Sequence, residues 1–274
     1  VFCITEMIER RAALTNACEP SVAFNRFVSE SILVLDVCET AAPLLPGSAY
    51  VDPSLPLIEG AAAARQIVME HLTPDNGRIA LLLSDIDLTR ARQVHEWLSS
   101  AGLCSEVLLV ERHHFAQRYP FLMGASAACI PSYPNQVDDN LFLGPMSSVN
   151  RTSLHDLAIT HVLSVVDHDV QLSVSPAPVH KLSRIRDECS ADITAVIRIA
   201  LPFISSALAG GGRVLVHCDR GASRSASVVA AHLMQVHGLN LCSALETIMA
   251  HRPCVRPNEG FMRQLNERRW QEVQ

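Results

Sequence analysis

The sequence predicts an α/β protein built as two three-layer αβα domains, each a parallel sheet with helices on both faces. Short apolar runs alternate with segments of helical periodicity in both halves of the 274-residue chain, and this alternation is typical of parallel sheets. The proline-containing segment 125–139 separates the halves and favours an extended conformation. The predicted domains are 19–124 and 135–272, joined by a linker at 125–134.

In the first domain, three apolar runs predict buried parallel strands at 32–35, 79–83 and 107–110. Apolar residues at helical spacing predict helices over 61–71 and about 91–101, between these strands. Strand and helix therefore alternate along the whole of this half.

The second domain repeats the alternation. Its expected strands are 141–143, 162–166 and 214–216, and its expected helices are 153–158, about 191–208, 223–236, 242–251 and 258–270. The run from Gly210 to Gly212 is placed to end the longest of these helices.

Composition and residue patterns argue against several classes of partner: nucleic acids, membranes, metals and cofactors. The formal net charge of −6 argues against a nucleic-acid partner, which would require a basic surface. No apolar run approaches the ~20 residues that span a bilayer, so no membrane partner is expected. The 12 histidines show no spacing typical of a metal site, and neither a metal nor a cofactor is expected.

The nine cysteines are scattered and odd in number, which favours a reducing compartment over a disulfide framework. We therefore expect a cytoplasmic protein. Nuclear and mitochondrial locations stay open, because a targeting segment ahead of Val1 would not be visible in this sequence.

Residues 214–225 carry the clearest chemical pattern: an apolar strand, a loop and a helix, reading Val-Leu-Val-His-Cys-Asp-Arg-Gly-Ala-Ser-Arg-Ser. This order directs backbone amides and the positive end of the helix dipole at one point, where a phosphate dianion binds. The same environment favours a thiolate, so Cys218 is the expected nucleophile on phosphorus. Gly221 permits close backbone approach, and Arg224 offers two parallel N–H donors. The predicted phosphate-binding residues are Asp219, Arg220, Gly221, Ala222, Ser223 and Arg224.

Two neighbours are expected to support the loop. His217 would hold its shape and favour the thiolate, and the Ser225 hydroxyl would stabilise the thiolate that leaves the phosphocysteine. The competing interpretation is a buried structural cysteine beside a surface arginine. It does not account for the strand, glycine and helix that surround the pair.

This pattern resembles the dual-specificity phosphatases of the protein tyrosine phosphatase superfamily, over about residues 134–271. Residues 140–144 (Asn-Leu-Phe-Leu-Gly) and 159–163 (Ile-Thr-His-Val-Leu) look like the family's first strands. Residues 252–265, from Arg-Pro-Cys-Val-Arg-Pro-Asn to Gln-Leu, look like its last helical segment. The resemblance implies a phosphocysteine intermediate.

The resemblance also implies a general acid in a loop before the long helix. It places Asp187 there, 31 residues before Cys218 (218 − 187 = 31). Glu188 is the fallback donor. The alternative is that Asp187 is a solvated loop or capping residue.

The first half resembles a rhodanese-like domain in residues 32–37 (Ile-Leu-Val-Leu-Asp-Val) and 119–122 (Tyr-Pro-Phe-Leu). Such a domain precedes the phosphatase domain in MAP kinase phosphatases and in the serine/threonine/tyrosine-interacting-like protein 1 family. The loop 84–87 (Ser-Asp-Ile-Asp) lacks the cysteine of a sulfurtransferase, and Cys38 stands where an arginine is usual. The resemblance thus implies a catalytically inactive domain with an unidentified protein partner.

The implied function is a protein phosphatase that hydrolyses phosphotyrosine, phosphoserine and phosphothreonine in a phosphorylated protein, with a MAP kinase among the candidate substrates. The alternative is a pseudophosphatase-like scaffold that binds phosphoproteins with little turnover. A phosphoinositide or RNA 5′-phosphatase shares the loop chemistry but needs more basic residues than this loop has, where Asp219 and Arg220 cancel. The presence of both Cys218 and Arg224 favours an enzyme.

Overall fold

The computed structural model describes residues 20–29, 33–36, 49–50, 79–84, 94, 106–122, 132–268 and 270. The chain divides into two compact units, residues 1–130 and 131–274. This division falls within the segment 125–134 that the sequence assigns to a linker.

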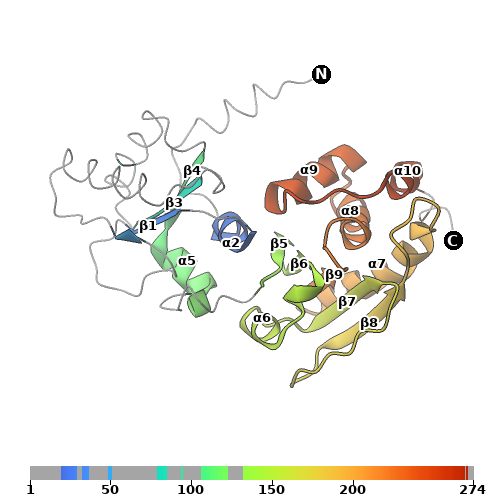
Figure 1. Cartoon of the computed structure of the whole chain (residues 1–274), viewed down its shortest axis with the longest axis horizontal. Coiled ribbons are helices and arrows are strands. Elements are labelled where there is room, and N and C mark those ends of the chain that lie inside the picture. The colour runs from blue at the N-terminus through green and yellow to red at the C-terminus, as the bar shows by residue number, and fades with distance from the viewer. Residues whose placement is uncertain are drawn as a thin grey trace. The chain divides into compact units, whose positions relative to one another are not determined.

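The described part of the first unit contains a sheet of four strands, all paired in parallel (Figure 1). In the order β2-β1-β3-β4, the strands are Ala49–Tyr50, Leu33–Asp36, Ile79–Ser84 and Glu106–Glu111. The strands expected at 32–35, 79–83 and 107–110 agree with β1, β3 and β4 to within one residue at each end. The expected helix at 61–71 lies outside the described residues, as does all of 91–101 except Val94, which is helical.

Four elements of this unit were not expected from the sequence. They are strand β2, helix α2 (Pro20–Ser29), helix α5 (Arg112–Arg118) and the 3₁₀ turn η1 (Pro120–Leu122). Phe24 of α2 stacks on Tyr119 with ring centroids 4.2 Å apart, and Phe115 lies 5.3 Å from the same ring. These buried rings join α2 to the end of α5.

The second unit holds a five-stranded sheet in the order β5-β6-β9-β7-β8. In chain order, the strands are β5 (Asn135–Asp138), β6 (Leu141–Gly144), β7 (His161–Val166), β8 (Val179–Arg184) and β9 (Val214–His217). Only β5 is antiparallel to its neighbour, and the other pairs are parallel.

In the described part of the second unit, five α-helices and a 3₁₀ turn accompany the sheet. They are η3 (Met146–Ser148), α6 (Arg151–Asp156), α7 (Ile193–Ala209), α8 (Arg224–Val236), α9 (Leu241–His251) and α10 (Glu259–Glu267). Figure 1 shows α6 on the other side of the sheet from α8 and α9. The expected αβα layering therefore holds in this unit.

Three details differ from the sequence-based expectation. Residues 135–138, within the segment expected to be extended, form strand β5, which pairs with β6 and was not itself expected. Strand β8 was not expected, because it is an edge strand whose side chains are largely exposed and so carry no apolar run. Helix α10 ends at Glu267 rather than at residue 270, because Arg268 adopts a left-handed conformation with φ 51°.

Both faces of the central strands are buried. Leu141, Leu143 and Val216 belong to the core formed with helices α7 to α10, and the intervening Phe142 and Leu215 are also fully buried. Because successive side chains point to opposite faces, the inner strands must be apolar at nearly every position. This is why they are visible in the sequence as short continuous runs.

Parallel pairing brings the carboxyl ends of β6, β7, β8 and β9 to one edge of the sheet. Ligands of open α/β sheets bind outside this edge. Among the described residues, no helix is both long and apolar enough to cross a membrane.

Candidate active site

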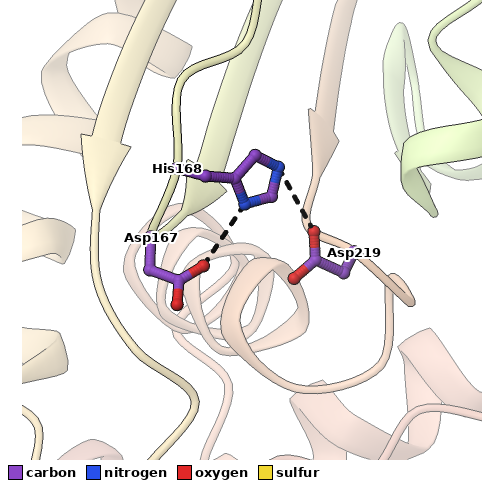
Figure 2. Close-up of side chains that lie close together, drawn as sticks. All are labelled: Asp167, His168 and Asp219. Carbon is purple, nitrogen blue, oxygen red and sulfur yellow. Dashed lines mark hydrogen bonds and ion pairs between the residues drawn. The ribbon is translucent and has the colours of Figure 1, made fainter.

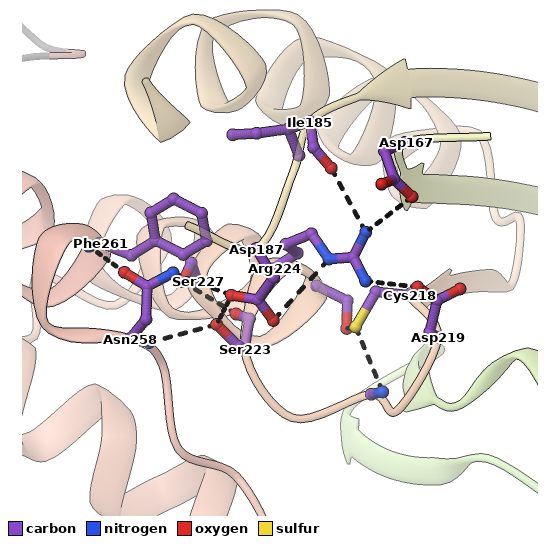
Figure 3. Close-up of polar contacts among 12 residues, drawn as sticks. Asp167, Ile185, Asp187, Cys218, Asp219, Ser223, Arg224, Ser227, Asn258 and Phe261 are labelled. Atoms are coloured by element: carbon purple, nitrogen blue, oxygen red, sulfur yellow. Dashed lines mark hydrogen bonds and ion pairs between the residues drawn. The ribbon is translucent and has the colours of Figure 1, made fainter. Parts of the chain in front are cut away.

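The loop between β9 and α8 surrounds the sulfur of Cys218, which is 1% exposed. The backbone N–H of Gly221 points at Sγ from 3.2 Å, and the hydroxyl of Ser225 donates to it at 3.1 Å. Figure 3 shows the sulfur inside the turn of the loop. Two donors from different parts of the loop are thus directed at one sulfur.

Arg224, the first residue of α8, is 6% exposed. Its Nη2 donates to Asp219 Oδ2 at 2.5 Å, and its Nη1 donates to the carbonyl of Ile185 at 3.3 Å. Nη1 lies 3.7 Å from Asp167 Oδ1, and Nε lies 3.8 Å from Asp187 Oδ2 (Figure 3). Burial alone lowers the pKa of Arg224, but the Asp219 hydrogen bond and the nearby negative charges outweigh burial, so its pKa is raised.

Gly221 lets the loop lie directly against the end of β6. Its φ is +64°, and a Cβ there would lie 2.5 Å from the carbonyl carbon of Gly144 and 2.8 Å from the nitrogen of Pro145. On the same side, the N–H of Met146 donates to the carbonyl of Asp219 at 3.1 Å. Any side chain at residue 221 would therefore push the loop off the sheet.

Arg252, which the sequence analysis gave no role, fixes the outer side of the loop. It is 9% exposed, and it donates to the carbonyls of Gly221 and Arg220 at 2.8 and 2.9 Å. Its third contact, to Asn135 Oδ1 at 2.7 Å, ties this arrangement to β5. Nearby, the N–H of Arg256 donates to the carbonyl of Ala222 at 2.8 Å. With its carbonyls held outward, the loop keeps its N–H groups free to face inward.

Asp187 lies beside the same loop. Its Oδ1 accepts hydrogen bonds from Ser223 Oγ at 2.6 Å and from Asn258 Nδ2 at 2.8 Å, and its Oδ2 faces Arg224. Glu188, by contrast, is 56% exposed and lies 3.8 Å from Arg186. Of the two carboxylates considered as proton donor, Asp187 is the one directed toward Arg224 and the loop.

The segment that carries Asp187 is fixed to α10. A Cβ on Gly260 would lie 2.5 Å from the carbonyl carbon of Cys189, so this glycine permits direct contact between helix and loop. Gln264 Nε2 donates to the carbonyl of Ala191 at 2.8 Å, and its Oε1 accepts from the N–H of Ile193 at 3.0 Å. The position of Asp187 thus depends on a helix that follows it by about 70 residues (258 − 187 = 71).

His217 is fully buried at the end of β9. Its Nε2 lies 2.6 Å from Ser164 Oγ, which is also 2.8 Å from Nε2 of His180. Burial lowers the pKa of His217 from 6.5 to about 4. A neutral imidazole brings no positive charge to the loop, so the contacts of His217 bear on the shape of the strand end.

Three more side chains gather at the carboxyl ends of β7 and β9. His168 lies between two carboxylates, with Nδ1 3.3 Å from Asp167 Oδ1 and Nε2 3.7 Å from Asp219 Oδ1 (Figure 2). The three residues have the spacing of cation ligands, but they are exposed, and their carboxylates already face the positive charge of Arg224. Asp167 and His168 directly follow a predicted strand, and that position was the only signal in the sequence.

The geometry brings together the residues that the sequence singled out. Cys218, Ser225, Arg224 and the loop N–H groups converge, and Asp187 reaches them from the end of β8. A thiolate, a guanidinium, inward-facing amides and a carboxylate are the groups that transfer of a phosphoryl group to sulfur requires.

The model of the dual specificity phosphatase catalytic domain matches residues 141–271. Dual specificity protein phosphatase 1 of Arabidopsis thaliana is 35% identical over 139 residues, which are 49% of this chain and 68% of that protein. Dual specificity protein phosphatase 1B of the same plant is 36% identical, over 48% of this chain and 80% of its own length. The chain belongs to the dual specificity phosphatase family.

A solved structure of a human tyrosine phosphatase-like serine/threonine/tyrosine-interacting protein shares 30% sequence identity. The match covers 49% of this chain and 93% of that one, with a TM-score of 0.47. With the family established, the second unit is a dual specificity phosphatase domain, and the chain is a cysteine-based protein phosphatase.

The buried neutral His217 predicts a loss of stability in acid. The unfolded chain binds its proton below about pH 6.5 and the folded chain only near 4, so stability falls as pH drops through this window. By pH 5 the loss from this group is about 2 kcal/mol. We expect His217→Asn to reduce the difference in unfolding free energy between pH 7 and pH 5, measured by urea denaturation. His155→Asn, at a side chain 83% exposed, should leave that difference unchanged. An undiminished difference in His217→Asn would contradict the assignment.

The contact between Gly260 and Cys189 predicts that Gly260→Ala displaces the Asp187 segment. A displacement of about 1 Å lowers kcat on the order of 10²-fold, while the loop still binds an oxyanion such as tungstate. Steady-state kinetics and tungstate titration measure the two effects. The control is Gly210→Ala, where φ is −79° and the new Cβ lies 3.5 Å from its neighbours. Equal effects of the two substitutions would show that the Gly260 contact does not position Asp187.

Proposed function

We propose that Cys218 is the nucleophile, that Arg224 and the loop amides hold the phosphoryl group, and that Asp187 is the general acid and then the general base. The observation that carries this proposal is the pair of donors on Cys218 Sγ, Gly221 N–H at 3.2 Å and Ser225 O–H at 3.1 Å. They stabilise a thiolate at the position from which the loop amides can receive a phosphate.

In the first step, the Cys218 thiolate attacks phosphorus and an S–P bond forms as the P–O bond to the substrate oxygen breaks. The proton of Asp187 goes to that oxygen, so an alcohol or phenol leaves. Asp187 is suited to this because Ser223 and Asn258 fix its orientation through Oδ1 while Oδ2 stays on the side of Arg224.

In the second step, water attacks the phosphocysteine and Asp187, now a carboxylate, takes its proton. The S–P bond breaks, inorganic phosphate leaves and the sulfur returns as a thiolate. The Ser225 hydroxyl, 3.1 Å from the sulfur, stabilises that leaving thiolate. No metal or cofactor is required in either step.

We propose phosphotyrosine and phosphoserine or phosphothreonine in proteins as substrates, with a MAP kinase as the candidate. The family of the second unit supports the phosphoprotein class. The sequence resemblance to MAP kinase phosphatases, in which the same pair of domains occurs, suggests the kinase.

For the first unit, we propose an inactive rhodanese-like domain that binds a protein partner. Its parallel sheet β2-β1-β3-β4 is compatible with that fold, and the absence of a cysteine from 84–87 argues against sulfur transfer. We further propose a cytoplasmic location, which the free thiols of Cys189, Cys218, Cys242 and Cys254 support.

The decisive test is Cys218→Ser. We expect the wild-type chain to hydrolyse phosphotyrosine and phosphothreonine peptides and the variant to hydrolyse neither, because a serine hydroxyl is a much weaker nucleophile than a thiolate. Phosphate release is the measurement. Cys242→Ser, at an exposed thiol on α9, is the matched control and should retain activity.

Wild-type protein with an intact thiol that turns over neither peptide would instead support the scaffold that binds phosphoproteins. Faster turnover of a phosphoinositide or a 5′-phosphorylated RNA than of either peptide would move the substrate out of the phosphoprotein class.

Asp187→Asn separates the two carboxylates considered as proton donor. We expect it to lower kcat on a phosphothreonine peptide by roughly 10²–10⁴-fold. The loss should be smaller on p-nitrophenyl phosphate, whose phenolate leaves without a proton. Glu188→Gln, which removes a charge directed toward Arg186, should stay close to wild type on both substrates. A larger loss in Glu188→Gln than in Asp187→Asn would transfer the role to Glu188.

A further inference from the structure

The arginine of the proposed phosphate site, Arg224, forms an ion pair with a carboxylate of the same loop, Asp219. Asp219 directly follows Cys218, and its Oδ2 accepts from Arg224 Nη2 at 2.5 Å (Figure 3). This is the shortest contact of the guanidinium among the described residues. Arg224 is 6% exposed, whereas the Asp219 side chain is 43% exposed and so has room to move toward solvent.

The guanidinium cannot serve Asp219 and a phosphate equally well at the same time. Its Nη1 donates to the carbonyl of Ile185, and its Nε is buried without a hydrogen-bond partner. A phosphate held in a bidentate manner needs two adjacent N–H groups, and the pair that excludes the Nη1 group bound to Ile185 is Nε with Nη2. Nη2 is the group that Asp219 occupies. A dianion beside a carboxylate also meets like-charge repulsion.

We propose that Asp219 is an internal competitor for the phosphate site, which pairs with Arg224 in the empty loop and is displaced by the phosphoryl group of the substrate. The inference rests on the proposed role of Arg224. An unpaired buried cation is costly, so the exchange keeps Arg224 paired before and after each turnover. The same exchange weakens the binding of substrate and of product phosphate.

A displaced Asp219 has a second partner close by. Its Oδ1 lies 3.7 Å from His168 Nε2 (Figure 2), and His168 also contacts Asp167 through Nδ1 at 3.3 Å. The carboxylate can therefore leave Arg224 by a small rotation without losing every polar neighbour. His168 and solvent receive it, and the Nη2–H of Arg224 becomes available to a phosphate oxygen.

The test compares Asp219→Asn and Asp219→Ala with the wild-type residue in the full-length chain. Asparagine keeps the shape and removes the charge, and alanine removes the contact. In a Cys218→Ser background, titration with sodium tungstate should show about tenfold tighter binding in both variants, as expected when a competing charge leaves a site near the surface. With Cys218 present, KM for p-nitrophenyl phosphate and Ki for inorganic phosphate should fall by a similar factor.

The matched control is Asp169→Asn. Asp169 is an exposed acid paired with Arg184. The substitution removes the same charge from the same edge of the sheet, at a residue that does not contact Arg224. Tightening in the Asp219 variants beyond that of Asp169→Asn supports competition. Equal tightening would assign the effect to general electrostatics, and weaker binding would assign Asp219 to orienting Arg224; either result overturns the inference. If no variant binds tungstate and the wild type lacks turnover, the proposed function fails, and the inference falls with it.

Discussion

Burial of the Arg224 guanidinium is the constraint around which the site is arranged. A cation that is 6% exposed needs anionic or carbonyl partners at every stage. The ends of three parallel strands provide them: Asp167 after β7, Ile185 and Asp187 after β8, and Asp219 after β9. The guanidinium that we propose to bind phosphate thus also holds three loops together.

The loop owes its shape to contacts made from outside it. The Arg252 side chain donates to the carbonyls of residues 220 and 221. The N–H of Arg256 donates to the carbonyl of Ala222, and the N–H of Met146 donates to that of Asp219. With four successive carbonyls bound on the outer side, the amides are left for the inner side, where Gly221 N–H already points at sulfur. Anion affinity and loop rigidity therefore have a common origin, because the same backbone orientation produces both.

The sequence predicted those features whose determinants are adjacent along the chain. The strand, glycine and helix at 214–225 are contiguous, so the turn that brings Cys218 and Arg224 together was predicted without a structure. Features that depend on distant segments were not predicted: Arg252 and Asn258 lie in the segment 252–265 that resembles the family, but their contacts are to Gly221 and Asp187, 31 and 71 residues away, and no local pattern reveals those contacts. Strand β8 lacked an apolar run because it is an exposed edge, and the neutral state of His217 follows from burial that composition does not reveal.

Helix α10 contacts the segment that carries Asp187, and so it determines where the proposed proton donor lies. Asn258 is the N-cap of this helix. Its Oδ1 accepts from Phe261 N–H and its Nδ2 donates to Asp187 Oδ1, so the start of the helix fixes the position of the carboxylate. The backbone that follows Asp187 is held by two contacts with the helix. Gly260 packs directly against Cys189, and the side-chain amide of Gln264 hydrogen-bonds to Ala191 and Ile193. A short surface loop fixed at three points loses most of its freedom on folding rather than on substrate binding. The cost of ordering Asp187 is therefore met by the packing of α10, and the proposed proton donor is in position before a substrate binds.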